Sequence, residues 1–382
     1  MQRSLMVLVL GCFAALLPAC GDLSTDASSG DGVDPTGALV TLHQDAPITE
    51  WSMDWSQAGA EGPFMGSTHE ILFDQAGGGD VLWVTGQLYD GLAMIGPTGE
   101  QSYFAMPEGS HPHGLAFGAD GQLFVSLESE GSIARVSDAG EIEEIFDIRM
   151  MLEGQSEAIN PAPHGIVVDP DRGTIWFTGK RTSTVGRLNP DGTVEHYPLE
   201  SLAAMPIYLH VDPSGGVWGT ELLGNKILHV SLEGELNEYP IPTRNSRPIA
   251  IVGGPDGNMW FSQEAGQRVA RIDMSGQITE FRVPVTQENM ILAGLAFDTD
   301  GNLWTHGYID QNAPEPAGDD YIIKIDRDIL DSADGSMSGI AVDLYRVPTR
   351  NTVMHRILEG PDGNIWFTEL GVDKVGMLQI AE

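Results

Sequence analysis

The hydrophobic pattern of the chain consists of short apolar segments separated by turns rich in glycine and aspartate. Residues 360–369 show the unit most clearly, because the turn Pro-Asp-Gly-Asn leads into a short segment with Trp366 at its centre. Residues 254–263 repeat the same phrase, and looser copies occur along the chain. The central aromatic residues of the copies are Trp83, Phe124, Trp176, Trp218, Trp260, Trp304 and Trp366.

Each repeat contains four such segments and no long helical period. The first segment comes before the aromatic one, as at residues 294–297. The aromatic segment is the second, residues 184–188 are an example of the third, and residues 278–284 are an example of the fourth, in which apolar and polar residues alternate. One four-stranded sheet cannot bury both of its faces, so neighbouring sheets must stack. A period of roughly 42 residues is typical of propeller blades. The pattern therefore predicts an all-β, seven-bladed β-propeller of four-stranded antiparallel blades.

The last repeat has no fourth segment, because the chain ends shortly after residues 374–378. Residues 47–51 match the missing pattern, since Pro-Ile-Thr-Glu-Trp resembles Gln-Ile-Thr-Glu-Phe at 277–281. We predict that residues 48–53 supply the outer strand of the last blade and close the ring. The propeller should then occupy residues 41–382. Longer spacings indicate two insertions, at 149–160 and 308–342, which we expect to be loops over one face.

The N-terminus resembles a bacterial lipoprotein signal over residues 1–19. Arg3 precedes an apolar run at 5–17 that is too short to span a bilayer, and Leu-Pro-Ala-Cys ends at Cys20. We expect Cys20 to be lipidated; the alternative is an ordinary cleaved signal beside a chance cysteine. Residues 20–40 are rich in Asp, Ser and Gly and predict a flexible tether. The expected location is the bacterial cell envelope, with the outer membrane as one option, and the membrane contact is the lipid anchor alone.

The composition of the 382 residues narrows the partners. The formal net charge of −36 argues against nucleic acid, whose phosphates need a basic surface. Both cysteines lie within the first 20 residues, so the propeller has no thiol for a disulfide or a metal site. We expect a monomer that takes a small-molecule or peptide ligand at its central channel.

Histidines recur at one position of the repeat, about eleven residues before the central aromatic. In a propeller the first strand is innermost, so this position should form the rim of the central channel. The position is occupied by His69, His113, His164 and His355 in four adjacent blades, and by Ile207, Ile249 and Ala293 in the others. Imidazole at such a place can serve as a base or as a metal ligand. The alternative is structural, with each histidine bonding the backbone of a neighbouring blade.

Two glutamates stand at the channel end of the second strand, three residues beyond the central aromatic. They are Glu221 and Glu369, and a carboxylate there could hold a hard cation such as Mg2+. The alternative is a solvated glutamate at a strand end. The Asp-Gly turns lack the ligand spacing of calcium loops, and ordinary turn chemistry explains them.

From about residue 48 to 382 the chain resembles the virginiamycin B lyase family. The phrases that carry this likeness are Trp-Phe-Thr-Glu at 366–369, Pro-His-Gly-Ile at 163–166 and Glu-Tyr-Pro-Ile-Pro-Thr at 238–243. The resemblance implies a seven-bladed propeller that performs a Mg2+-assisted elimination. In that reaction a base removes a proton alpha to the ester carbonyl of a cyclic depsipeptide, and the ring opens without water. The resemblance places the base at His355 and a Mg2+-binding carboxylate at Glu369.

Two further positions of the family pattern are not matched, since they fall on Val353 and Ala293. His306, which we also count among the channel-rim candidates, and Tyr308 lie in the same predicted blade as Ala293 and are candidates to replace the missing side chains. Two functional hypotheses follow. One is a lyase-like enzyme that uses His355 and Glu369 on an ester. The other is a non-catalytic envelope propeller that binds a ligand or a protein, because fold alone does not decide function.

Overall fold

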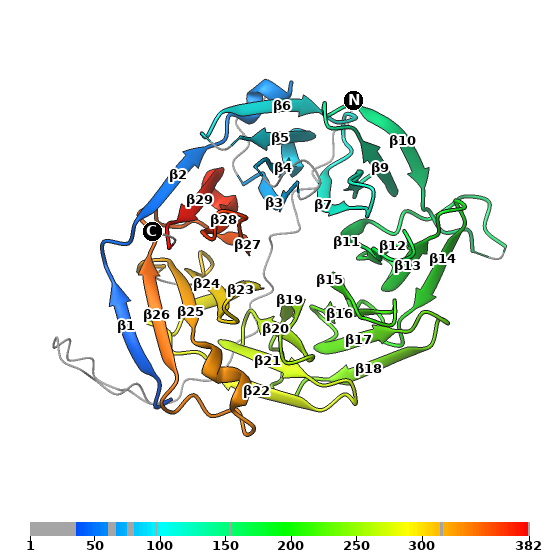
Figure 1. Ribbon diagram of the computed structural model, residues 1–382. Helices are drawn as coiled ribbons and strands as arrows, with labels where there is room; N and C mark the ends of the chain where they lie inside the picture. Colours follow the sequence, from blue (N-terminus) through cyan, green and yellow to red (C-terminus); the bar gives the residue numbers. More distant parts are fainter. Residues whose placement is uncertain are drawn as a thin grey trace.

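The computed structural model confirms a seven-bladed β-propeller, with the sheets arranged around a central axis (Figure 1). The structure describes residues 36–59, 66–74, 80–96, 98–152, 154–313 and 316–380. The expected signal peptide, Cys20 and the tether up to residue 35 lie outside these residues. Within the described part, no helix is long and apolar enough to cross a membrane.

In blades 1 to 5 the strands follow the order of the sequence outward from the axis, with the first strand innermost, and blades 6 and 7 each add one outer strand from the N-terminal segment (Figure 1). Blade 1 consists of β3 (Thr68–Phe73), β4 (Leu82–Gly86), β5 (Gly91–Ile95) and β6 (Gln101–Ala105). Blade 2 consists of β7 (Pro112–Phe117), β8 (Leu123–Leu127), β9 (Ser132–Val136) and β10 (Ile142–Asp147). Blade 3 consists of β11 (Pro163–Val168), β12 (Ile175–Gly179), β13 (Thr184–Leu188) and β14 (Val194–Pro198).

The next blades follow the same plan. Blade 4 consists of β15 (Pro206–Val211), β16 (Val217–Glu221), β17 (Lys226–Val230) and β18 (Leu236–Pro240). Blade 5 consists of β19 (Pro248–Gly253), β20 (Met259–Gln263), β21 (Arg268–Ile272) and β22 (Ile278–Arg282). Blade 6 contains β23 (Met290–Phe297), β24 (Leu303–Ile309), β25 (Tyr321–Ile325) and β26 (Ala341–Arg346). Blade 7 contains β27 (Met354–Glu359), β28 (Ile365–Glu369) and β29 (Lys374–Leu378). The described residues also form the short 3-10 helices η1 (Trp55–Ala58), η2 (Gln87–Tyr89), η3 (Arg327–Asp331) and η4 (Leu370–Val372).

The second strands carry the large side chains that form the core between blades. Trp176 and Phe177, for example, are fully buried. A Cβ at Gly186 would lie 2.0 Å from the ring of Phe177, so glycine in the third strand is what makes room for the aromatic ring. The same relation recurs in blade 7 between Gly376 and Phe367. The aromatic repeat in the sequence is therefore a packing repeat.

In five blades, a hydroxyl two residues after the central aromatic donates to a backbone carbonyl of the next blade; the residues are Ser126, Thr178, Thr220, Ser262 and Thr368. In blade 3, Thr178 Oγ1 accepts the Gly165 N–H at 2.9 Å and donates to the Ile207 carbonyl of blade 4 at 3.2 Å. In blade 7, Thr368 Oγ1 donates across the ring closure to the His69 carbonyl at 3.1 Å. We call this position the blade staple. It fixes the relative height of neighbouring inner strands, where the candidate histidines lie.

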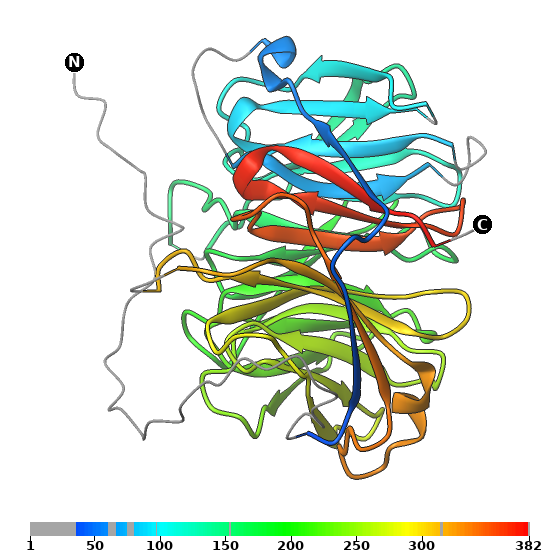
Figure 2. The same ribbon diagram turned by 90° about the vertical axis from the view of Figure 1, so that its left-hand side faces the viewer.

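The N-terminal segment closes the ring as predicted. Strand β2 (Ile48–Ser52) pairs antiparallel with β29, and the ring of Trp51 stacks on that of Trp366 with 5.2 Å between centroids. The sequence did not predict a second attachment, in which β1 (Leu39–His43) pairs in parallel with β26 as a fifth strand of blade 6 (Figure 2). Four of the five β1 residues are exposed, so the strand has no buried face for a hydrophobic pattern to report.

The larger insertion does not lie over one face, and that expectation was wrong. Residues 310–320 join β24 to β25, whereas residues 326–340 join β25 to β26, so the two halves leave opposite ends of the blade. We call the end that carries the blade-to-blade connections and the turns between second and third strands the histidine face. The opposite end, which carries the Asp-Gly turns, is the turn face. Residues 310–320 belong to the histidine face.

Candidate functional site

The four predicted histidines meet on the propeller axis, each as the second residue of an innermost strand. Measured between ring centroids, His69 lies 4.0 Å from His355 and 4.3 Å from His113. His113 stacks on His164 at 3.5 Å. The inner strands β27, β3, β7 and β11 are neighbours around the axis (Figure 1). Staples link blade 7 to blade 1 at the His69 carbonyl and blade 2 to blade 3 at the His164 carbonyl.

Three functional candidates that sequence reasoning missed stand one residue after the rim position. They are Glu70, Tyr208 and Arg356. The Tyr208 hydroxyl hydrogen bonds to Glu70 Oε1 and lies 2.6 Å from His355 Nε2. Arg356 Nε is 3.0 Å from Glu70 Oε2, and its guanidinium lies 4.6 Å from the centre of the Tyr208 ring. Three blades, 1, 4 and 7, thus contribute to one buried network.

A signal for these residues does exist in the repeat. The other four blades carry small residues at this position, namely Gly114, Gly165, Ala250 and Gly294. A Cβ at Gly165 would lie 2.3 Å from the Ile207 carbonyl oxygen, so close approach of the next blade explains the small residue there. Three large polar residues at a position that is otherwise small would have drawn attention to Glu70, Tyr208 and Arg356.

His164 belongs to a second part of the network. Its Nδ1 lies 3.0 Å from Glu128 Oε2, and Lys180 Nζ lies 2.9 Å from Glu128 Oε1. Gln87 Nε2 donates to the same carboxylate at 3.1 Å. Neither Glu128 nor Lys180 was predicted, because they follow strand ends without a repeated motif.

Burial sets the charge of this cluster. Loss of water lowers the pKa of His69, His113, His164 and His355 well below the usual value, and neighbouring imidazoles and Lys180 lower these pKa values further. The imidazoles are therefore neutral at pH 7 and hold lone pairs. Burial also raises the pKa of Glu70, against the opposing effect of Arg356, and raises the pKa of Tyr208 well above its usual value.

Four of these side chains form a candidate metal centre. His69, Glu70, His113 and His355 each offer one ligand atom, and these atoms lie within 4.8 Å of one another. His69 Nδ1 and His113 Nε2 are buried and have no hydrogen-bond partner. Buried polar atoms are nearly always paired, so these two nitrogens point to a ligand.

Glu369 lies outside this group of four, in an arrangement it shares with Glu221. Each ends a second strand opposite a lysine, Lys374 for Glu369 and Lys226 for Glu221. Burial and a nearby carboxylate raise the pKa of Glu221 to about 7 and that of Glu369 to about 8. Lys374 bonds Glu50 of β2 at 2.6 Å. A recurrence in two blades favours a structural role within the blade.

His306 takes a place different from the rim position we expected. It is fully buried and stands at the staple position of blade 6, where its Nε2 accepts the Gly294 N–H at 3.2 Å. Burial lowers its pKa to about 3. The imidazole thus accepts a backbone N–H of the first strand, as the Thr368 hydroxyl does in blade 7.

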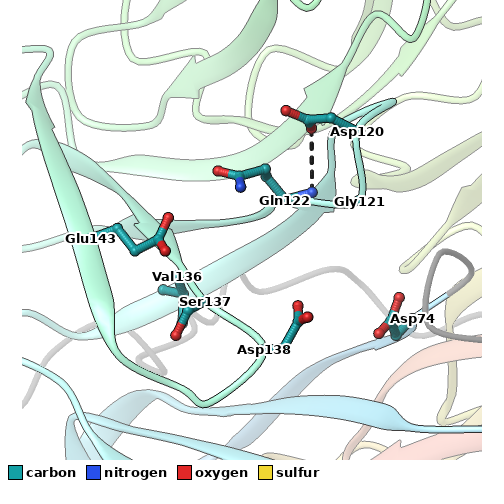
Figure 3. Close-up of a pocket in the computed structure, with 8 residues that line it drawn as sticks. All are labelled: Asp74, Asp120, Gly121, Gln122, Val136, Ser137, Asp138 and Glu143. Atoms are coloured by element: carbon teal, nitrogen blue, oxygen red, sulfur yellow. Dashed lines mark hydrogen bonds between the residues drawn. The ribbon is translucent and has the colours of Figure 1, made fainter.

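Two surface pockets lie on the turn face, away from the histidines. One is lined by turn residues of blades 1 and 2 and is acidic, with Asp74, Asp120, Asp138 and Glu143 around it (Figure 3). Within it Asp120 accepts the backbone N–H of Gln122, as in an ordinary turn. A second pocket is lined by residues that follow β11, β15 and β19.

The fold and the site together define a class: a seven-bladed β-propeller with a buried imidazole and carboxylate cluster on its axis. Residues 40–313 match the model of the Virginiamycin B lyase family, and the chain belongs to that family. A virginiamycin B lyase from Nocardia farcinica (strain IFM 10152) is 29% identical over 139 residues, which cover 36% of this chain. The match spans 44% of that relative, less than half of its length.

Solved structures support the same fold. A streptogramin B lyase structure is similar with a TM-score of 0.70 and 22% identity, over 87% of this chain and 97% of the other. A selenomethionine-substituted virginiamycin B lyase from Staphylococcus aureus gives 0.69 and 22%, over 88% and 100%. A catalytically inactive variant of the Staphylococcus aureus enzyme, solved with quinupristin, gives 0.69 and 23%, also over 88% and 100%.

Proposed function

We propose that the protein is a lyase that opens an ester ring by elimination, with His355 as the base. The observation that carries this proposal is the contact of His355 Nε2 with the Tyr208 hydroxyl, in a cluster where burial keeps imidazole neutral. The lowered pKa leaves His355 unprotonated at pH 7, so its lone pair is available for the substrate proton, while burial makes this imidazole a weaker base than a free one. Family membership supports the reaction class.

The chemistry restricts which proton is taken. When the C–O bond of an ester breaks by elimination, the oxygen leaves as a carboxylate. The electrons of the breaking C–H bond must therefore form a double bond to the carbon that held this oxygen. The proton then comes from the neighbouring carbon, rather than from the carbon alpha to the ester carbonyl. His355 takes the proton, and no water is added.

Positive charge for the developing anion is available beside the base. The Arg356 guanidinium and the Lys180 ammonium flank the histidines, and each is already paired with a glutamate. Fixed donors of this kind stabilise charge that develops in the transition state. We assign the orientation of His355 to Tyr208, and the electrostatic role to Arg356.

The residues near the base do not fit Mg2+, the metal that the resemblance implies. Mg2+ requires near-octahedral oxygen ligands. The group of four on the axis contains one carboxylate, Glu70, which Arg356 and Tyr208 already bond. The raised pKa of Glu369, about 8, leaves it mostly protonated at pH 7. Binding of Mg2+ at Glu369 stays a prediction, and no step above depends on it.

An apolar substrate suits the histidine face. Five exposed large apolar side chains stand in its connections across blades 1 to 4 and offer apolar contacts to a ligand on this face. They are Leu88, Met151, Leu152, Leu202 and Leu223. We propose a small molecule or cyclic peptide with an internal ester as the ligand, which agrees with the quinupristin complex of the Staphylococcus aureus relative.

Quinupristin gives a direct test of the proposal. Elimination leaves the mass of the ring unchanged and creates a double bond, whereas hydrolysis adds one water, so mass spectrometry and ultraviolet absorbance separate the two. We expect ring opening without mass change, and a loss of at least about 100-fold in His355→Gln. His43→Gln, on the exposed β1, is the matched control. An intact ring at high protein concentration would remove quinupristin as a substrate.

The burial of the histidines favours a second candidate function, a non-catalytic binding propeller. His113 is fully buried, and its Nδ1 lies 3.0 Å from the His164 carbonyl oxygen, so it also has a packing role. Calorimetry with quinupristin distinguishes the two: heat of binding without any ring-opened product would favour the binding protein.

We also propose that the chain is an exported lipoprotein anchored at Cys20 and monomeric. The sequence of residues 1–20 supports the anchor. Labelling with an alkyne fatty acid should tag the full chain and leave a Cys20→Ser variant unlabelled. Equal labelling of both would contradict lipidation at Cys20, and light scattering checks the monomer.

A further inference from the structure

We propose that His69, His113, His355 and Glu70 bind a transition-metal dication of the Zn2+ type, and that its binding blocks His355 as a base. The second half of this inference rests on the proposed function, whereas the metal site itself does not. The ligands come from β3, β7 and β27, on blades 1, 2 and 7, so the site exists only in the closed ring.

The geometry is close to that of a four-coordinate site. The four ligand atoms lie within 4.8 Å of one another. Around a tetrahedral Zn2+ with bonds of about 2.0–2.2 Å, ligand atoms lie about 3.4 Å apart. A tetrahedral site therefore requires the ligand atoms to approach one another by rotation of the side chains.

Two nitrogens of the cluster have nothing else to bind. His69 Nδ1 and His113 Nε2 are buried without a hydrogen-bond partner. Burial of an unpaired polar atom is unfavourable, because the atom loses its hydrogen bonds to water. A metal ion satisfies both nitrogens together, which explains why two adjacent blades retain buried imidazoles at this position.

The surrounding groups already orient the ligands. The His164 carbonyl oxygen lies 3.0 Å from His113 Nδ1, so this nitrogen carries the proton and Nε2 keeps the lone pair. Arg356 holds Glu70 Oε2 at 3.0 Å and leaves Oε1 toward the histidines. Hydrogen bonds of this kind fix the orientation of metal ligands.

The composition of the ligands selects the class of metal. Three imidazoles and one carboxylate suit Zn2+ and its transition-metal neighbours, while Mg2+ and Ca2+ require oxygen ligands. The cluster therefore fits a different metal from the one that the family resemblance implies.

Binding of the metal has a consequence for catalysis. The Tyr208 hydroxyl contacts both His355 Nε2 and Glu70 Oε1, two of the atoms nearest to the proposed ion. An ion bound by His355 uses the lone pair that a base needs, and it displaces Tyr208 from that nitrogen. The metal-bound protein should be inactive in elimination.

Co2+ is the probe for the site, because its visible absorption reports geometry. The full chain is stripped with EDTA, dialysed and titrated with CoCl2. We expect one equivalent bound with the intense absorption of a tetrahedral ion, displaced by ZnCl2 and not by MgCl2. His69→Gln and His355→Gln should each weaken binding at least tenfold, and His43→Gln should not. Circular dichroism checks that each variant folds.

Three results would overturn the metal site: no stoichiometric Co2+ binding to the wild-type chain, the weak absorption of an octahedral ion, or unchanged affinity in the folded His69→Gln and His355→Gln variants. A separate assay tests inhibition. If quinupristin is opened equally fast with one equivalent of Zn2+ bound, the blocking of His355 is wrong. If Zn2+ binds as expected but no form of the protein opens quinupristin, quinupristin is removed as a substrate and the metal site stands.

Discussion

The Tyr208 hydroxyl of blade 4 lies 2.6 Å from His355 Nε2 of blade 7, across the axis of the propeller. The same hydroxyl also bonds Glu70 of blade 1. A phenol has one proton to donate, so it can donate to Glu70 or to His355 at one time. The protonation states of the carboxyl and the imidazole are therefore coupled, and Tyr208 links the base to the Glu70–Arg356 pair.

Removal of this hydroxyl should slow the base and leave the fold intact. In Tyr208→Phe the imidazole loses its orienting partner, at a cost of about one hydrogen bond, so we expect about a tenfold lower kcat. Because Glu70 and His355 no longer share a proton, the pH profile of kcat/KM should also shift. An unchanged rate and profile would show that Tyr208 only fills space. Tyr239→Phe, on the outer strand β18, is the control.

The sequence predicted the fold well because the propeller is a packing repeat. The aromatic residue and the Asp-Gly turn recur because each blade needs the same core side chain and the same tight turn. The missing fourth strand of the last repeat predicted that β2 closes the ring, and β2 does so. Strand β1 was not predicted, because it lies exposed on an outer edge and buries no face that would give a hydrophobic pattern. The prediction that the insertion at 308–342 lies over one face was wrong, because the length of an insertion does not show between which strands the extra residues fall.

The site was predictable in part for a similar reason. The four histidines share one position of the repeat, so their meeting on the axis followed from the register. Glu70, Tyr208 and Arg356 are each unique to their blade, and a search for recurring residues passes over them. Their contacts depend on side chains that reach across the ring, which no local pattern encodes.

The closure of the ring should depend on Trp51. Its ring stacks on Trp366 and packs in the core between the first and last blades. We expect Trp51→Ala to lower the free energy of unfolding by about 2–4 kcal/mol, because it removes a large partly buried ring and its stacking. Urea denaturation followed by circular dichroism measures this. Trp51→Phe should lose less than half as much, and equal losses in both variants would contradict a role for ring size.

The buried carboxyl of Glu221 should make stability depend on pH. Burial and the nearby Glu238 raise its pKa from 4.5 to about 7 in the folded state. Between these pH values the unfolded chain has released the proton and the folded chain has kept it, so stability falls as pH rises through this window. Glu221→Gln removes this dependence. The variant should gain about 1–3 kcal/mol relative to wild type from pH 4.5 to 7.5.

Denaturant titrations at several pH values measure this difference. The exposed Glu141→Gln on blade 2 is the matched control, and it should show no such trend. A constant difference between Glu221→Gln and wild type across the window would mean that the folded and unfolded states bind this proton alike. Ring opening should be unaffected by Glu221→Gln, because the residue lies in a blade network with Lys226 and Glu238.

His306 offers a test that separates structure from catalysis. Its Nε2 accepts the Gly294 N–H at the position where Thr368 accepts the Arg356 N–H in blade 7. A threonine should therefore replace it, whereas valine, of nearly the same shape, leaves a buried N–H unpaired. We expect His306→Thr to be more stable than His306→Val by about 1–3 kcal/mol, with both opening quinupristin at the rate of the wild-type protein.

The contrary outcome would be informative about substrate binding. If both variants are equally stable and both raise KM, His306 acts as a ligand contact, as its place near Ala293 in the sequence first indicated. Equal stability with unchanged kinetics would instead mean that water pairs Gly294 in the valine variant. The Thr and Val pair differs by one hydroxyl, so a difference in unfolding between them measures the staple bond itself.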